Sequence, residues 1–265
     1  MIFNNLDPGY YARDLLDAFN ITSLPIDPFL ISDNLGIKFN FRDLDKIEAM
    51  FLLKNGKKRI ILRDNEYFDN RIRFTVAHEL GHYILPWHTE DIFTCYSSDI
   101  LSFKAYRPQE TEANYFAAEL LLPTRYLSCD LNNLPYNFET LTDIASKYMV
   151  SLSSVAIKAI DFTYEPIGLI FTQDNRVKWT VQSKYMLREL YSKGTKLNQF
   201  TGLYQYYTED KAISTKPELV YSMAWLRDGS DEESLSEQTI MMPTINAALT
   251  IIALDNNDNE NDEEY

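Results

Sequence analysis

Residues 71–85 of the chain read RIRFTVAHELGHYIL, which is its most informative segment. The stretch contains His78, Glu79 and His82 as an H-E-x-x-H motif. Residues four apart share one side of an α-helix, so the two imidazoles converge on one point. The pattern predicts a helix that offers two nitrogen ligands to a zinc ion.

Glu79 adds a carboxylate one residue along from the first imidazole. From that position it can reach a water bound by the same metal, take its proton and pass the proton to a leaving amine. This is the chemistry of peptide hydrolysis. The chain holds only three histidines, all between residues 78 and 88, and this clustering argues against a chance motif.

A catalytic zinc usually has three protein ligands and one open position, so a third ligand is needed. His88 follows His82 by six residues, which is the spacing of the pattern H-E-x-x-H-x-x-G-x-x-H. The Gly of that pattern is missing, because Leu85 stands in its place and Pro86 follows. The turn that would bring His88 back to the metal is therefore poorly matched.

Glu110 is the other candidate, near the start of a second strong helix, PQETEANYFAAELLLP. Asn114 lies four residues later on the same face, where it can hold a ligand histidine by its other ring nitrogen. The rival acids fit less well, since Glu112 points about 200° away and Glu119 is more than two turns on. We favour Glu110 and expect His88 to be a bystander or part of the pocket wall.

Local signals predict further elements along the chain. Asp-Pro pairs start two helices, Asn55-Gly56 joins two strands, and a Pro or Gly ends several elements. The expected elements are helices from Asp7-Pro8, from Asp27-Pro28 to about Gly36, from Asn70 to Leu85 (capped by Asp69) and from Pro108 to Leu122; strands at Ile37–Phe41, Ala49–Leu53 and Arg59–Leu62; two short helices within 139–162, joined at Met149-Val150 with Ser151 capping the second; and strands at 167–171 and 176–181.

Composition places the protein among ordinary folded chains, with 45% hydrophobic and 24% charged residues. The N-terminus lacks the layout of a signal peptide and no apolar run is long enough to span a membrane, so no membrane partner is expected. Only Cys95 and Cys129 are present, too few for a disulfide framework. We expect plain thiols and a cytoplasmic protein.

The formal net charge is -14, and residues 255–265 carry six of the acids and no base. Without this tail the charge is still -8. Such a surface repels phosphate backbones, so direct nucleic-acid binding is not expected. The tail itself is typical of a disordered, solvated end.

The paired motifs RFTVAHELGHYIL and, about thirty residues later, EANYFAAELLLP resemble the ImmA/IrrE family of metallo-endopeptidases. The order of elements is similar too, with PIDPFLISDNLGIKF before the motif and TLTDIASKYMVSLSSVAIKAI after it, and the resemblance covers about residues 24–182. It implies Zn²⁺ held by His78, His82 and Glu110, with Glu79 as general acid and base. It also implies a protein substrate, a helix-turn-helix transcriptional repressor of a mobile-element or stress-response system.

We therefore expect an α+β protein: a zincin-like metallopeptidase domain, a helix-turn-helix-like subdomain and a smaller C-terminal α+β region. The expected boundaries are 1–135 for the peptidase domain, 136–164 for the helix-turn-helix-like subdomain, 165–254 for the C-terminal region of unknown role, and 255–265 for the tail.

The alternative function is a DNA-binding or sensory regulator with a silent peptidase fold. The second short helix, SLSSVAIKAIDF, carries one Lys and one Asp, whereas a DNA-reading helix presents several basic or amide side chains. We expect this helix pair to serve packing or substrate docking, and the presence of Glu79 argues against a silent site.

Overall fold

The computed structural model describes residues 7–64, 70–96, 107–209 and 213–254. Helices and two sheets alternate along the chain, so the expected α+β class is confirmed. By its internal contacts the chain separates into two compact units, 1–130 with 143–154 and 131–142 with 155–265.

The sheet of the first unit has the strand order β1-β3-β2-β4. Its strands are β1 (Ile37–Arg42), β2 (Ile47–Lys54), β3 (Lys57–Arg63) and β4 (Ile92–Tyr96). Strand β1 runs parallel to β3, and the other pairs are antiparallel. The predicted hairpin is confirmed: Asn55 and Gly56 join β2 to β3 with φ of 51° and 73°, which is the turn that Asn-Gly favours.

Two helices of the first unit, α1 (Pro8–Ala18) and α2 (Pro28–Asn34), begin where capping residues predict. The other helices of this unit are α3 (Asn70–Ile84), α5 (Pro108–Leu121) and α6 (Thr124–Asp130). Asp7 accepts a hydrogen bond from the Gly9 amide at 2.9 Å, and Asp27 accepts one from the Phe29 amide at 2.9 Å. The expected cap Asp69 lies outside the described residues.

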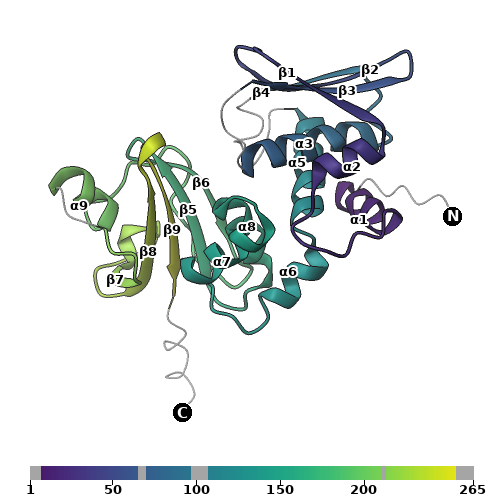
Figure 1. Ribbon diagram of the computed structural model, residues 1–265. Coiled ribbons are helices and arrows are strands. Elements are labelled where there is room, and N and C mark those ends of the chain that lie inside the picture. Colours follow the sequence, from purple (N-terminus) through teal and green to yellow (C-terminus); the bar gives the residue numbers. More distant parts are fainter. Residues whose placement is uncertain (1–6, 65–69, 97–106, 210–212, 255–265) are drawn as a thin grey trace. The chain divides into compact units, whose positions relative to one another are not determined.

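Helix α3 lies along one face of the sheet, and α5 crosses it (Figure 1). The residues of α3 from Thr75 to His82 are all buried, including the polar ones. Gly81 lets the two helices approach closely, because a Cβ there would lie 3.2 Å from the Ala113 Cα. This packing places the polar side chains of both helices inside the unit.

Two short helices come next, α7 (Phe138–Tyr148) and α8 (Leu152–Ala159), as predicted. Met149 between them has a left-handed backbone, with φ of 52°. The Ser151 hydroxyl accepts a hydrogen bond from the Ser154 amide at 3.1 Å, which confirms its capping role. A single turn of 3₁₀ helix, η1 (Ile160–Phe162), continues α8.

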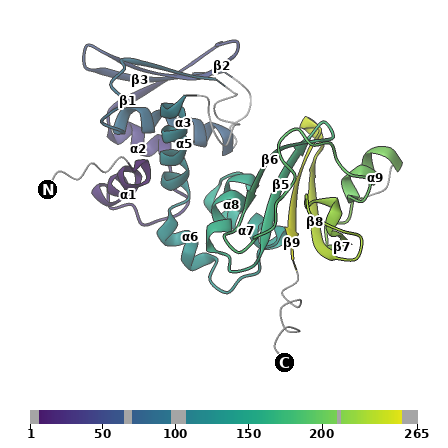
Figure 2. The same cartoon turned by 180° about the vertical axis from the view of Figure 1, so that it is seen from behind.

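The second unit is built on an antiparallel sheet with the order β6-β5-β9-β8-β7 (Figure 2). Its elements are β5 (Ile167–Gln173), β6 (Arg176–Gln182), α9 (Gly202–Glu209), β7 (Glu218–Tyr221), η2 (Ser222–Ala224), β8 (Ser234–Met242), η3 (Pro243–Ile245) and β9 (Ala247–Ala253). The predicted hairpin of β5 and β6 turns at Asp174 and Asn175, both with positive φ. The core cluster includes Trp225, whose indole donates to Glu237 at 2.6 Å.

Several elements were not predicted from the sequence, namely β4, α6, α9, β7, β8 and β9. Each is short or lacks a clear alternation of apolar and polar residues. The acidic tail, expected to be disordered, lies outside the described residues. Within the part that the structure describes, no helix is both long and apolar enough to cross a lipid bilayer.

Candidate metal centre

His78 and His82 project from the buried face of α3. Their exposed fractions are 0% and 1%, and their Nε2 atoms lie 3.1 Å apart. The four-residue spacing on the helix brings the rings together as the sequence predicts. Both imidazoles therefore present the same nitrogen to one interior point.

Glu110 reaches the same point from the first turn of α5. Its Oε2 atom lies 3.1 Å from His78 Nε2 and 3.6 Å from His82 Nε2. One ligand atom from each of the three residues lies within 4.8 Å of the others. Among the described residues, no group able to hold a metal includes His88.

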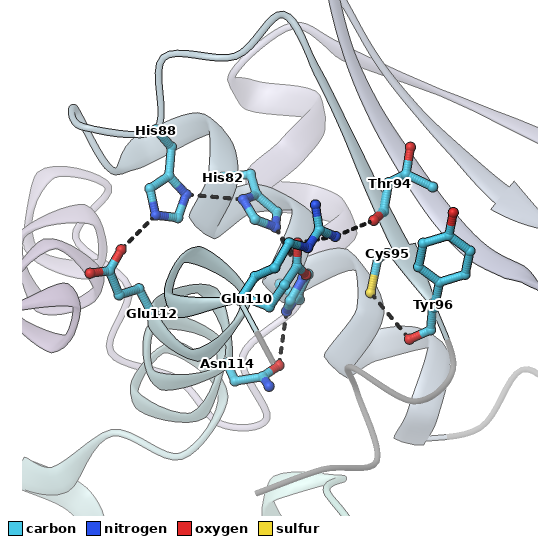
Figure 3. Close-up of polar contacts among 10 residues, drawn as sticks. His82, His88, Thr94, Cys95, Tyr96, Glu110, Glu112 and Asn114 are labelled. Carbon is cyan, nitrogen blue, oxygen red and sulfur yellow. Dashed lines mark hydrogen bonds and ion pairs between the residues drawn. The ribbon is translucent and has the colours of Figure 1, made fainter. Parts of the chain in front are cut away.

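Asn114, one turn along α5, fixes the orientation of His78. The two residues are joined at 2.9 Å through His78 Nδ1 and Asn114 Oδ1 (Figure 3). An amide oxygen can only accept, so His78 Nδ1 carries a hydrogen, and in the neutral ring Nε2 keeps its lone pair. The lone pair then points at Glu110 and His82.

His88 lies behind His82, not beside the metal-facing nitrogens. Its Nδ1 is 2.9 Å from His82 Nδ1, and its Nε2 is 2.9 Å from Glu112 Oε2 (Figure 3). The Trp87 indole also donates to Glu112, at 2.8 Å. The Glu112 carboxylate accepts from His88 Nε2, which leaves His88 Nδ1 to accept from His82. His88 is thus in contact with a candidate ligand, and its expected place as a bystander or part of the pocket wall stays a prediction.

The hydrogen bond of His78 with Asn114 and the series from His82 through His88 to Glu112 have the same effect on the candidate metal centre. His78 and His82 each use Nδ1–H as a donor, so their Nε2 lone pairs face each other and the Glu110 carboxylate. Three acceptors within 4.8 Å, without a donor among them, repel one another unless a cation lies between them. Two imidazoles and a carboxylate are also the ligand set of a common catalytic zinc site.

The electrostatics of the three residues agree with this interpretation. Burial lowers the pKa of His78, yet Cys95, Glu110 and Glu79 together raise it well above its usual value. Burial lowers the pKa of His82 to about 4. Burial raises the pKa of Glu110, but hydrogen bonds with both histidines outweigh it and bring that pKa well below its usual range. A proton on His78 Nε2, which the raised pKa favours, is therefore one cation that can lie between the three acceptors.

Glu79 is the fourth polar side chain at this point, and its exposed fraction is 0%. Both carboxylate oxygens are buried without a hydrogen-bond partner in the described part of the chain. Burial raises its pKa to about 8, against the smaller lowering effects of His78 and the Phe51 backbone. A carboxylate with this pKa can hold or release a proton near neutral pH.

Residues around strand β4 complete the surroundings. The Phe93 ring stacks on His82 with centroids 4.1 Å apart. Arg107 lies 2.8 Å from Glu110 Oε1 and donates to the Thr94 carbonyl at 2.9 Å, so it ties the start of α5 to β4. Sequence reasoning missed Phe93 and Arg107, and it considered Glu112 only as a rival ligand. The strand was not predicted, and no local signal marks a partner that packs from another element.

Comparison with known proteins adds to the geometry. Residues 32–159 match the family model of a peptidase family, described as the IrrE N-terminal-like domain. The resemblance noted in the sequence is thus confirmed over α3, β4, α5 and the helix pair. No curated protein sequence matches the chain.

Beyond the IrrE N-terminal-like domain, most of the chain shares its fold with a solved structure, a Mycobacterium tuberculosis transcriptional regulator. The match covers 93% of this chain and 87% of the other, with a TM-score of 0.54 and 16% sequence identity. At that identity the likeness concerns the fold alone.

Proposed function

We propose that the protein is a zinc-dependent endopeptidase whose substrate is another protein, a helix-turn-helix transcriptional repressor. The observation that supports this most is the convergence of His78 Nε2, His82 Nε2 and Glu110 Oε2 beside an unpartnered Glu79 carboxylate. The nature of the substrate rests on the resemblance to the ImmA/IrrE family.

In this proposal the two histidines and Glu110 hold the metal. Zinc supplies Lewis-acid chemistry, which activates a water and polarises the carbonyl of the scissile bond. Asn114 and His88 keep the imidazoles oriented through their Nδ1 atoms, as the hydrogen bonds at 2.9 Å indicate.

Glu79 moves the proton. One of its oxygens accepts the proton of the attacking water and then gives it to the amine that leaves. A pKa of about 8 suits both proton transfers, because the Glu79 carboxylate can take up and give off a proton close to neutral pH. Burial of the carboxylate also keeps bulk water from competing for the proton.

The test is cleavage of candidate repressors by the full-length protein and by its Glu79→Gln variant. We expect the variant to keep the fold and about one zinc per chain, while cleavage falls by ~10²–10⁴-fold, since the general base is lost. The matched control is Glu232→Gln, which removes an exposed carboxylate in the second unit and should cleave normally.

Two results would contradict the proposal: a Glu79→Gln protein that cleaves as fast as the wild type, and wild-type cleavage that a chelator leaves unchanged. The alternative is a sensory or DNA-binding regulator with a silent peptidase fold, which the similar mycobacterial transcriptional regulator suggests. It predicts no fragment from any repressor, whereas the proposed peptidase predicts one that depends on Glu79.

A further inference from the structure

The sheet of the first unit has one covered face and one open face. Helices α2 and α3 pack on the covered face, where Phe39 meets Phe29 and Phe93 meets His82, with ring centroids 5.1 and 4.1 Å apart. Figures 1 and 2 show these helices on one side of the sheet, and no described element of this unit lies on the other side. Side chains alternate along a strand, so every second residue of each strand faces the open side.

The open face is basic. The charged side chains that the strands present there are Lys38 and Arg42 on β1, Lys54 on β2, and Lys57, Arg59 and Arg63 on β3. The nearby Glu48 is buried at the bulge of β2 and is ion-paired with Arg63. Arg42 and Arg59 are exposed and have no carboxylate partner in the described part of the chain. The chain has 39 acids and 25 bases, so this face has the opposite sign to the molecule as a whole.

Apolar side chains lie beside these bases. In the register of the sheet Leu52 is between Arg59 and Ile92, and Met50 is opposite Ile61. Ile92 is 54% exposed, and the other three apolar residues are partly exposed. The solvent face of an antiparallel sheet normally carries polar side chains at such positions. Neighbouring exposed apolar residues with a polar rim are typical of a surface that binds another protein.

We propose that the open face binds an amphipathic helix of a partner protein, in which acidic side chains flank an aliphatic stripe. The residues that contact the helix are Arg42, Met50, Leu52, Arg59, Ile61 and Ile92. The aliphatic side chains cover the stripe, and the two guanidiniums pair with carboxylates of the helix. Because no metal takes part in this contact, the inference stands or fails apart from the proposed function.

The apolar patch favours a protein over a nucleic acid. Single strands are bound by stacking of bases on aromatic rings, and Tyr96 is the one aromatic residue that the described strands present to the open side. A duplex would also bring many phosphates close to a molecule with a net charge of -14. An acidic helix needs fewer positive groups, and it gains from the burial of aliphatic side chains.

Strand β4 contributes both to the open face and to the surroundings of the candidate metal centre. Ile92 faces the open side, whereas the next residue, Phe93, is buried and stacks on His82. A helix seated on Ile92 is therefore held against the strand that lines the candidate metal centre.

The test is fluorescence anisotropy of a labelled synthetic helix with the full-length protein. The helix has about 18 residues, with Leu at the i, i+3, i+4 and i+7 positions of one side and Glu or Ala elsewhere. We expect saturable binding with or without a chelator. The double variant Arg42→Glu with Arg59→Glu should weaken binding about tenfold or more, and so should Leu52→Ser.

Matched control variants carry the same changes in the second unit. Lys193→Glu with Lys196→Glu reverses two exposed charges there, and Leu187→Ser removes a leucine that is 88% exposed. Both controls should bind the helix as tightly as the wild type does. A helix with Lys in place of every Glu should not bind, which tests the sign of the charge on the wild type alone.

The proposal is overturned if the acidic helix does not bind, if the Lys helix binds equally well, or if the variant at Arg42 and Arg59 keeps full affinity. Binding of oligo(dT) in place of the helix would identify a nucleic-acid surface, and a dimer that the same variant dissociates would place a second copy of the chain there. Either result overturns the proposal. Helix binding by a protein that takes up no zinc would support the open face while the proposed function fails.

Discussion

The position of His88 could be predicted from the sequence only in part. Its distance of six residues from His82 suggested either a third ligand or a bystander in the pocket wall, and the structure places its ring against Nδ1 of His82. The His88 amide bonds back to the Leu85 carbonyl at 3.0 Å, so the chain turns immediately after α3. The turn brings the His88 ring to the Nδ1 side of His82. Glu112 on α5 accepts a hydrogen bond from the other ring nitrogen of His88.

The loss of zinc affinity on substitution should be larger for a metal ligand than for a residue that orients a ligand. We expect Glu110→Ala to abolish tight zinc binding, because it removes a ligand atom, and His88→Ala to weaken it by about 10–100-fold, because it removes an orienting hydrogen bond. Tyr115→Ala, exposed on the same helix, should leave zinc affinity unchanged. Competition with a chelating dye measures all three.

The ranking has a clear contrary outcome. If His88→Ala loses zinc and Glu110→Ala keeps it, the third ligand is His88 and the ring must turn away from Glu112 when the metal binds. Equal and small losses for both would mean that neither residue supports the metal.

Protonation at His78 predicts how zinc binding depends on pH. Its pKa lies well above the usual value, as Cys95, Glu110 and Glu79 outweigh the opposing effect of burial. Zinc must displace that proton, so affinity rises with pH as long as the unbound protein still holds it. We expect affinity to keep rising between about pH 7 and 8, where an ordinary histidine site has already levelled off.

Zinc titrations at several pH values, with proton release followed in weak buffer, test this dependence. A constant affinity above neutral pH, with no proton released, would show that His78 is already neutral in the unbound protein. The Asn114→Ala variant offers a useful comparison, because it removes the partner of His78 Nδ1 and leaves the other ligands untouched.

At the scale of elements, the contact between α3 and α5 sets the geometry of the centre. One helix carries both histidines and the other carries Glu110, and Gly81 is where they touch. A Cβ at this position would lie 3.2 Å from the Ala113 Cα and 3.2 Å from the Phe116 ring. The backbone atom of Ala113 cannot move aside unless α5 moves with it.

We therefore expect Gly81→Ala to lower zinc affinity by pushing Glu110 away from the histidines. Overpacking costs about 1–3 kcal/mol, which outweighs the gain of about 1 kcal/mol in helix propensity, so the free energy of unfolding should also fall. Thermal melts and zinc titrations measure the two effects.

The matched control is Gly168→Ala on β5. A Cβ there would lie 2.9 Å from the Ile252 side chain, so this variant should lose stability as well. It lies in the other unit and should bind zinc normally once folded. Normal zinc affinity in Gly81→Ala would show that the helices can separate without moving the ligands.

Elements with strong local signals were predictable, and those that depend on distant partners were not. Asp-Pro caps, the Asn55-Gly56 turn and the terminating prolines each act within a few residues, and they placed α1, α2, α3, α5 and the β2–β3 hairpin. Strand β4 is five residues long and is held in the sheet by pairing with β2. Because β4 was missed, the positions of Phe93 and Cys95 against the histidines could not be foreseen.

At the scale of the whole molecule, the two units differ in how well the sequence explains them. The centre falls within residues 32–159, which match the peptidase family, and its ligands come from a short stretch of chain. The second unit was expected only as an α+β region of unknown role, and its boundaries remain predictions. Its central strand β9 pairs with β5 and β8, which are separated by about sixty residues, so local patterns could not specify the sheet.

The charge of the whole molecule bears on the alternative function. The net charge is -14, and -8 remains without residues 255–265. In the helix pair, α8 buries Val155, Ala156 and Ala159, and Lys147 at the end of α7 is paired with Asp130 at 2.7 Å. Few positive groups are left to face a phosphate backbone.

We therefore expect no saturable binding of duplex DNA at about 0.15 M salt, where contacts between exposed charges are already screened beyond about 8 Å. Fluorescence anisotropy with labelled duplexes, one random and one from the region upstream of the gene, is the measurement. The repressor proposed as substrate provides the positive control, because it should bind the upstream duplex. Binding tighter than about 10⁻⁶ M, weakened by salt and by Lys158→Glu, would instead identify α8 as a DNA-reading helix. The helix pair would then have to serve DNA as well as packing, and the proposal of a peptidase acting on repressors would need a second function beside it.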